Sequence, residues 1–379
     1  MRRYLVPAVS ILMSVSLAAQ SAPSAAPSNP WMSLMLKAKA HAEAHGARTP
    51  LLSPLDRTVV PVAFGLPGDT VAVPVADLQA QGIRVVPWTT NDPEKMRAVI
   101  RSGVDGLISD RPDLLQHVLA EERAARPNDP KLTHFVVSAH RGGRGLRPEN
   151  TLPSFESGLD QLATELETDT GVSTDHVSLI WHDQFYNPQS CRRADGSAYT
   201  KEKLVYLQDI SSADAQKTFI CDQLHFGSDQ KNDLALSPVA VAFAKQEHLV
   251  NPYVATYVAQ LFRFVGFYVD YYSTGAGKGQ PHAAERAANA RTVRFNIETK
   301  IMPTITADSS ELMKQLPPNH TVDPQTFVTT LAGVITKAGM TDRAAIQSFD
   351  FRTLVLVEEQ FPKIPTFYLT ESSHPPALQ

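Results

Sequence analysis

The polar residues that organise this chain lie in one segment, residues 135–183, which reads FVVSAHRGGRGLRPENTLPSFESGLDQLATELETDTGVSTDHVSLIWHD. Alternate residues of a strand lie on one face, about 7 Å apart, so Glu167 and Asp169 can present two carboxylates to one cation. The segment therefore predicts strands that end in a metal-binding or catalytic site. Its polar clusters, each after a short apolar run, are His140 with Arg141, Glu167 with Asp169, and His182 with Asp183.

The order and spacing of these clusters resemble the glycerophosphodiester phosphodiesterase family. The shared features are a His-Arg-Gly triplet at 140–142, Pro-Glu-Asn-Thr at 148–151, Glu-x-Asp at 167–169 and His-Asp at 182–183. FNIETK at 295–300 and IQSFDFRTL at 346–354 look like the family's later motifs, in the same order. The resemblance covers most of residues 135–369 and also residues 76–119. It implies a metal-dependent phosphodiesterase on a (β/α)8 barrel.

The amino terminus has the pattern of a secretory signal peptide. Arg2 and Arg3 precede an apolar run, and the triplet at 16–18 resembles a cleavage site. We therefore expect residues 1–18 to be a signal peptide and the protein to be exported, either periplasmic or secreted. A membrane anchor is the alternative, but the run is shorter than the ~20 residues that span a bilayer, so we expect no stable membrane insertion.

The charge and the cysteine content limit which binding partners and which cellular compartment are expected. The formal net charge of −4 would become −6 without Arg2 and Arg3, which gives no attraction to nucleic acid and leaves a small molecule as the expected partner. In an exported protein, Cys191 and Cys221 suggest a disulfide, worth about 3 kcal/mol in a chain-entropy model. Metal binding by this pair is disfavoured, because neither has a His or another Cys at ligand spacing.

Residues 19–50 are expected to form a leader and an N-terminal helix. The leader is rich in proline and small residues, and a helical pattern over 31–45 ends before Gly46. His41 and His45, at i and i+4, could share a metal, but no acidic third ligand is expected to accompany them, so a solvated helix face is favoured.

The remaining residues, 51–379, are expected to form one α/β domain, a TIM barrel with an insertion at 184–232. Residues 76–119 resemble the family's last two strand–helix units, with Trp-Thr-x-Asn-Asp at 88–92 and Gly-Val-Asp-Gly-x-x-x-Asp at 103–110, yet they precede its first unit. This order predicts a circular permutation in which family strands 7 and 8 come before strand 1, with residues 83–88 beside 366–369. The eight expected strands are 83–88, 104–109, 135–139, 164–170, 178–181, 294–300, 345–348 and 366–369.

Two alternatives to this arrangement are open. A barrel fragment fused before an incomplete barrel could borrow strands from another copy, and the oligomeric state is not defined by the sequence. Residues 250–272 are apolar and aromatic and could face lipid, but Asn251, Gln260, Arg263 and Asp270 interrupt them, which favours a buried barrel helix.

Side chains at the carboxyl ends of barrel strands face one mouth, so the predicted site residues should converge. By resemblance, Glu167, Asp169 and Glu298 bind one divalent cation, and hard carboxylate oxygens suit Ca²⁺ or Mg²⁺. Arg141 and Lys300 are the candidates for binding the remaining phosphate oxygens.

The resemblance also gives His140 and His182 the general acid and general base roles, without saying which is which. Whether water attacks directly or a cyclic phosphate forms first is equally open. Trp88 is expected to form an apolar wall for the glycerol carbons, with a core tryptophan as the alternative. Glu149 and Asp183 are expected to orient Arg141 and His182.

Three functions follow from these features. The first is hydrolysis of glycerophosphodiesters to glycerol 3-phosphate and an alcohol. The second is a phospholipase D-like activity on lysolipids or sphingolipids. This interpretation is less favoured, because the exported lipases of that kind have Asp where Glu298 stands. The third is a catalytically silent barrel that binds a ligand or the cell wall.

Overall fold

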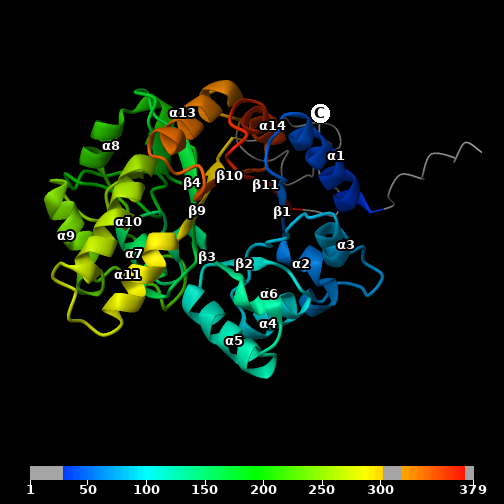
Figure 1. Ribbon diagram of the computed structural model, residues 1–379. Helices are drawn as coiled ribbons and strands as arrows, with labels where there is room; N and C mark the ends of the chain where they lie inside the picture. The colour runs from blue at the N-terminus through cyan, green and yellow to red at the C-terminus, as the bar shows by residue number, and fades with distance from the viewer. Residues whose placement is uncertain (1–28, 302–317, 372–379) are drawn as a thin grey trace, which may run out of the picture.

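The computed structural model describes residues 29–301 and 318–371, and its centre is a single curled sheet of parallel strands (Figure 1). Neighbouring strands follow the order β1-β11-β10-β9-β4-β3-β2. Each adjacent pair along this path is parallel. The bounds are β1 Leu51–Pro54, β2 Gly106–Ser109, β3 Val136–Ala139, β4 Glu165–Val172, β9 Arg294–Thr299, β10 Ala344–Ser348 and β11 Thr366–Thr370.

Residues 84–88 close this sheet into a ring by bonding to both of its end strands. On one side the amide of Val86 donates to the carbonyl of Leu52 in β1 (2.9 Å), and on the other the amide of Ile108 in β2 donates to the carbonyl of Pro87 (2.9 Å). The segment is the eighth member of the ring within the described residues. Eight parallel strands with helices outside them make the predicted (β/α)8 barrel.

The sequence assigned one strand of the ring wrongly. Ser178–Ile180 (β5) pairs antiparallel with β4 and with β8 (Thr256–Tyr257), outside the ring. The short link between β4 and β5 turns back at Ser173, whose amide donates to the carbonyl of Val177 (3.1 Å), and so short a link permits only an antiparallel hairpin. The missing ring strand is β1, which no predicted strand covered.

The position of β1 also corrects the predicted neighbours of residues 83–88. Leu51 is in register with Phe367 of β11, and Leu52 bridges to Val85, so β1 lies between the two segments that were expected to pair. The ring nevertheless closes within one chain. The circular permutation of the family's strand order stays a prediction.

The helices pack around the outside of the ring (Figure 1). Aspartates cap two of them: Asp92 caps α4 by accepting a hydrogen bond from the amide of Lys95 (3.0 Å), and Asp323 caps α13 through the amide of Thr326 (3.0 Å). The main ones are α4 Pro93–Arg101, α5 Pro112–Ala125, α7 Leu152–Asp160, α9 Pro238–Gln246, α10 Val258–Ser273, α11 Ala283–Thr292, α13 Pro324–Lys337 and α14 Phe351–Gln360. Short ones are α2 Asp56–Val59, α3 Val75–Ala80, α6 Pro130–Thr133 and α8 Ser212–Thr218.

Helix α10 corresponds to the aromatic segment at 250–272, although it begins at Val258. Phe264 and Tyr268 are fully buried and belong to the main hydrophobic core, which confirms a buried barrel helix. Among the described residues, no helix combines the length and the apolar character needed to cross a bilayer.

The predicted N-terminal helix is present as α1 (Pro30–Ala44), beside α14 (Figure 1). Trp31 is fully buried, and its indole nitrogen donates to Thr370 Oγ1 (3.2 Å) at the end of β11. The sequence had favoured a solvated face for His41, but the fold brings an acidic side chain to it: His41 Nδ1 lies 2.8 Å from Glu358 Oε2 of α14. The predicted signal peptide, residues 1–18, lies outside the described residues.

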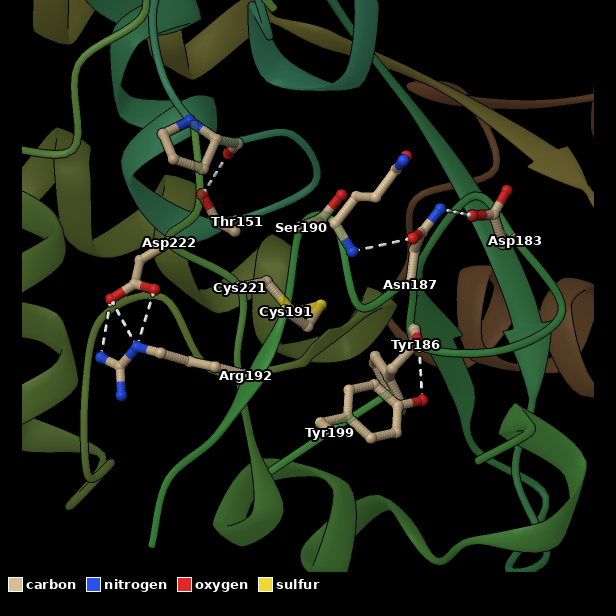
Figure 2. Close-up of a disulfide and its surroundings, with 12 residues drawn as sticks. Thr151, Asp183, Tyr186, Asn187, Ser190, Cys191, Arg192, Tyr199, Cys221 and Asp222 are labelled. Atoms are coloured by element: carbon tan, nitrogen blue, oxygen red, sulfur yellow. Dashed lines mark hydrogen bonds and ion pairs between the residues drawn. A yellow bond between two sulfur atoms is a disulfide. The ribbon is translucent and has the colours of Figure 1, made fainter. Parts of the chain in front are cut away.

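Cys191 and Cys221 form the predicted disulfide (Figure 2). It closes a lobe in which β6 (Arg192–Arg193) pairs antiparallel with β7 (Phe219–Ile220). The lobe has a small core of its own, separate from the barrel core, which includes Trp181, Tyr186, Leu207 and Phe219. The disulfide therefore fastens a second packed unit beside the carboxyl end of β5.

Candidate active site

Three carboxylates meet where β4 and β9 lie side by side. Asp169 of β4 is in register with Glu298 of β9, and Glu167 precedes Asp169 by one strand repeat. One oxygen from each of the three lies within 4.8 Å of the other two, and all three residues are buried. The pairing of neighbouring strands thus brings together the three residues that the sequence nominated as metal ligands.

The pKa values of these carboxyl groups are consistent with a cation-binding site. Burial, together with the nearby Asp169 and Glu298 carboxylates, raises the pKa of Glu167 well above its usual value. Burial also raises the pKa of Glu298 to about 7. Burial opposes ionisation of Asp169 too, but Arg141, His182 and Lys300 lower its pKa below the usual range. Asp169 Oδ1 is buried without a hydrogen-bond partner, with Lys300 Nζ 4.0 Å away, and the donor set fits Ca²⁺ or Mg²⁺.

Two basic side chains lie against the carboxylates. Arg141 Nη1 donates to Glu149 Oε2 (2.7 Å), and Arg141 Nε lies 3.2 Å from Asp169 Oδ2. Lys300 Nζ lies 2.9 Å from Glu298 Oε1. Both side chains also line the central cavity, so each can reach an anionic ligand there. Glu149 contacts Arg141 as the sequence predicted.

His140 follows β3, and an aspartate orients its ring. His140 Nδ1 lies 2.6 Å from Asp110 Oδ1, and His140 Nε2 lies 3.8 Å from Glu167 Oε2. Arg144 Nε donates to the same Asp110 oxygen (2.6 Å). Burial lowers the pKa of His140 to about 4, against the opposing effect of Asp110. Burial alone would raise the pKa of Asp110, but His140 and Arg144 lower it below its usual range.

His182 follows β5, on the other side of the carboxylates. Its Nδ1 lies 2.8 Å from Asp183 Oδ1, and Asp183 Oδ2 accepts a hydrogen bond from Asn187 Nδ2 (2.9 Å), as Figure 2 shows for the last pair. Burial lowers the pKa of His182, and the charges of Arg141 and Lys300 lower it further. About a third of its side chain is still exposed (32%), so the ring has one edge in the cavity mouth.

A cavity of about 260 Å³ joins these groups. Trp88 forms part of its wall: the indole nitrogen donates to the carbonyl of Ser53 (3.1 Å), and the ring meets Phe349 edge to face at 5.4 Å. Most of the predicted site residues thus line one space, whereas Asp169, Glu149 and Asp183 are not part of its lining. Its lining comprises Leu55, Trp88, Thr89, Ile108, His140, Arg141, Arg144, Glu167, His182, Glu298, Lys300, Gln347, Phe349 and Leu369.

Comparison with known proteins agrees with this geometry. The sequence model of the glycerophosphoryl diester phosphodiesterase family matches residues 19–114 and 140–378, most of the chain. The chain belongs to this family.

Individual relatives of this phosphodiesterase family member match over shorter stretches. The glycerophosphodiester phosphodiesterase domain-containing protein 4 of Macaca fascicularis is 34% identical over 97 residues, 25% of this chain and 15% of that protein. The Mus musculus protein named lysophospholipase D GDPD3 is 35% identical over 75 residues, 20% of this chain and 23% of that protein. The chain therefore spans less than a quarter of the length of either relative.

Solved structures of the family are more distant. A glycerophosphoryl diester phosphodiesterase from Silicibacter pomeroyi is 20% identical, with a TM-score of 0.40 over 62% of this chain and 65% of that one. An Oleispira antarctica phosphodiesterase, solved in complex with the product sn-glycerol-3-phosphate, is 16% identical, with a TM-score of 0.35 over 61% and 64% of the two chains.

Several residues of this family member's site were missed from the sequence. Asp110 ends the Gly-Val-Asp-Gly-x-x-x-Asp signature directly after β2, a position that itself indicates the barrel mouth. Asn150 Nδ2 donates to Asp169 Oδ2 (2.9 Å), and Gln347 Nε2 donates to Glu167 Oε1 (2.6 Å). Both lie inside quoted motifs, so their motif membership was the available signal.

The turn after β3 fixes the chain for these contacts. Arg141 has a φ of +50°, which aims its amide at Glu167 Oε2 (2.9 Å). Gly142 follows with a φ of +82°, and a Cβ there would lie 2.7 Å from the amide nitrogen of Phe155. The His-Arg-Gly triplet therefore needs its glycine for close approach to α7 as well as for backbone conformation.

Proposed function

We propose that this protein hydrolyses glycerophosphodiesters to glycerol 3-phosphate and an alcohol with the help of one divalent cation. The observation that carries the proposal is the convergence of two carboxylates, two imidazoles and two basic side chains on one cavity, with the carboxylate of Asp169 beside the other two. Membership of the family supports the same reaction class.

Glu167, Asp169 and Glu298 would bind the cation, Ca²⁺ or Mg²⁺. When bound, it would supply positive charge to a phosphodiester oxygen and offset the charge that develops in the transition state. The lack of a hydrogen bond at Asp169 Oδ1 and the raised pKa values of Glu167 and Glu298 support this assignment, because a cation would favour ionisation of both glutamates.

His140 is the better candidate for the general base. Asp110 accepts from Nδ1, which fixes the ring proton there and leaves the Nε2 lone pair directed at the cavity. The lowered pKa of His140 keeps the ring neutral near pH 7. His182 is then the candidate general acid: burial, Arg141 and Lys300 lower its pKa, but Asp169 and the contact with Asp183 favour the protonated ring, and its partly exposed edge can take a proton from water.

Arg141 and Lys300 would bind the remaining phosphate oxygens, and the wall of Trp88 with Phe349 would accommodate the glycerol carbons. Glu149 and Asp183 would act by orienting Arg141 and His182. Whether the nucleophile is water or a substrate hydroxyl is tested by looking for a cyclic glycerophosphate among the products.

The first experiment is incubation with glycerophosphocholine in the presence of Ca²⁺ or Mg²⁺, with and without chelator. Release of glycerol 3-phosphate only with metal is expected. Glu298→Gln should abolish the metal-dependent release, whereas Glu285→Gln, an exposed site on α11, should leave it unchanged. Release that persists in chelator would contradict the metal requirement.

The second experiment separates the roles of the histidines through the leaving group. In a diester of p-nitrophenol, the nitrophenolate can leave without being protonated. His182→Ala should therefore lose about 10²-fold or more of its activity on glycerophosphocholine and far less on the nitrophenyl diester. His140→Ala should lose activity on both substrates. The reverse pattern would exchange the two roles.

A second candidate function is release of the head group from lysolipids. It is favoured by the match to the relative named lysophospholipase D and by the apolar residues Leu55 and Leu369 in the cavity wall. Turnover of micellar lysolipid with none of the soluble diester would support it. Binding of glycerol 3-phosphate without turnover of either substrate would support a catalytically silent barrel.

We also propose that the protein is exported, with residues 1–18 as the signal peptide and residues 51–379 as one barrel domain with an insertion at 184–232. The disulfide between Cys191 and Cys221 supports an oxidising compartment. Sequencing the amino terminus of the protein recovered from its cell tests this: an end near residue 19 is expected, and an intact Met1 would contradict export by cleavage.

A further inference from the structure

Two histidines and a glutamate meet on the outside of the barrel, where α1 lies against α14. His41 belongs to the last turn of α1, His45 is the residue that caps its carboxyl end, and Glu359 lies near the end of α14. One ligand atom from each of the three lies within 4.8 Å of the others, and His41 Nε2 is 3.4 Å from Glu359 Oε1. None of the three belongs to the lining of the central cavity.

The hydrogen bonds of the two imidazoles leave a free nitrogen on each. His45 Nδ1 lies 2.9 Å from the carbonyl oxygen of His41, and because a carbonyl only accepts, the proton is on Nδ1. His41 Nδ1 lies 2.8 Å from Glu358 Oε2 and donates in the same way. In both rings Nε2 is therefore the atom available as a ligand.

Glu358 is placed to orient His41 rather than to bind an ion. Its side chain is buried, and its other oxygen accepts from Thr366 Oγ1 (2.8 Å) and Tyr368 Oη (3.1 Å) of β11. Imidazoles that bind metals generally donate their other N–H to a carboxylate or a backbone carbonyl, and this is the arrangement of both rings here.

We propose that His41, His45 and Glu359 form a second metal site, for a transition metal such as Zn²⁺, which fastens α1 to α14. Two imidazoles and one carboxylate suit Zn²⁺, with water as a fourth ligand, and differ from the all-carboxylate set of the cavity. The site would link the end of α1, which leads into β1, to the helix that leads into β11. It does not depend on the proposed phosphodiesterase activity.

Calorimetric titration of the metal-stripped full chain with Zn²⁺, in excess Mg²⁺ to occupy the carboxylate site, tests this proposal. The unsubstituted protein should bind one Zn²⁺, and His45→Ala and Glu359→Gln should each lower the affinity at least about tenfold. The matched control is His117→Ala, because His117 and Glu121 form an exposed pair on α5 (3.3 Å) that lacks a second histidine. It should bind Zn²⁺ like the unsubstituted protein.

Thermal unfolding gives an independent readout. Zn²⁺ should raise the Tm of the unsubstituted chain and of His117→Ala, but not that of His45→Ala. His45 is exposed, and far-UV circular dichroism in chelator checks that its variant folds; if it does not, Glu359→Gln decides. The proposal would be overturned if the unsubstituted chain bound no Zn²⁺, or if the His45 and Glu359 variants bound Zn²⁺ as tightly as the unsubstituted chain. His41 would then be only a hydrogen-bonding link between the helices.

Discussion

Asp110 Oδ1 lies 2.6 Å from His140 Nδ1, and this contact joins the end of β2 to the turn after β3. Asn91 Nδ2 donates to the second Asp110 oxygen (2.7 Å), and Arg144 donates to the first. The carboxylate is therefore fixed from three directions and fixes the imidazole in turn. Two neighbouring strands of the ring, rather than one motif, set the tautomer of this histidine.

Replacing Asp110 with Asn should lower kcat by about 10²-fold or more with little change in KM. The amide no longer requires a proton on Nδ1, so part of the His140 population presents a protonated Nε2 to the cavity. Steady-state kinetics on glycerophosphocholine measure this. Asp113→Asn, which removes a carboxylate paired with Arg111, is the matched control and should retain activity. An unchanged kcat for Asp110→Asn would remove the orienting role.

His140 should make the free energy of unfolding depend on pH. Its folded pKa is about 4, whereas the usual value is 6.5, so between these pH values the unfolded chain binds a proton that the folded chain does not. The contribution of His140 to stability should therefore fall as the pH is lowered from about 6.5 to about 4, by on the order of 3 kcal/mol, whereas Glu298, whose pKa is raised to about 7, contributes in the opposite direction. Asp110 contributes little to the change in this window. Its pKa in the folded state is lowered, so the stability that it provides is lost only below pH 3.8.

Urea unfolding in chelator, at the two ends of that pH range, measures the effect. His140→Gln should be less stable than the unsubstituted chain at neutral pH and should show a smaller loss on acidification. An equal loss in both proteins would mean that other groups, such as His182, account for the acid sensitivity.

Gly142→Ala should destabilise the protein by about 2 kcal/mol or more and lower activity. Its φ of +82° costs a side chain about 1–2 kcal/mol, and the new Cβ would also press on the backbone of Phe155 at 2.7 Å. Gly339→Ala separates the two causes, because Gly339 has a φ of +67° and no atom within 4 Å of an added Cβ. Equal losses of stability, measured by urea unfolding, would contradict the close-approach argument.

Removing the disulfide with Cys191→Ser and Cys221→Ser should cost about 3 kcal/mol and also lower kcat. The amide of Cys191 donates to the carbonyl of Asn187 (2.8 Å), and Asn187 supports Asp183 behind His182. Asn187→Ala should reproduce much of the loss in kcat with a smaller loss of stability. Full activity in the doubly substituted protein would show that the lobe does not support His182.

The sequence predicted most of the ring because its strands are short apolar runs that lie within or beside family motifs. It missed β1 because Leu51–Pro54 is short, ends in proline and is buried on both faces, so it lacks the alternation that identifies a half-exposed strand. It placed residues 178–181 in the ring because an apolar run before His-Asp has the same local pattern whether its partner is parallel or antiparallel.

The proximity of the three carboxylates and the two histidines could be predicted because these residues lie in ordered motifs. Contacts between elements were harder to predict, because proximity in space is set by packing. Asp110 meets His140 only when β2 and β3 are adjacent, and Glu358 and Glu359 meet His41 only when α1 docks on α14. The spacing of residues within a single segment predicts neither contact.

The register of Leu51 with Phe367 bears on how the polypeptide reaches its native state. Because β1, near the start of the barrel, pairs with β11, near its end, the sheet cannot complete its hydrogen bonds while the ribosome is still making the middle of the chain. Such high contact order slows folding and keeps apolar edges open. This topology therefore predicts that the sheet can close only after the last strand of the barrel has been synthesised.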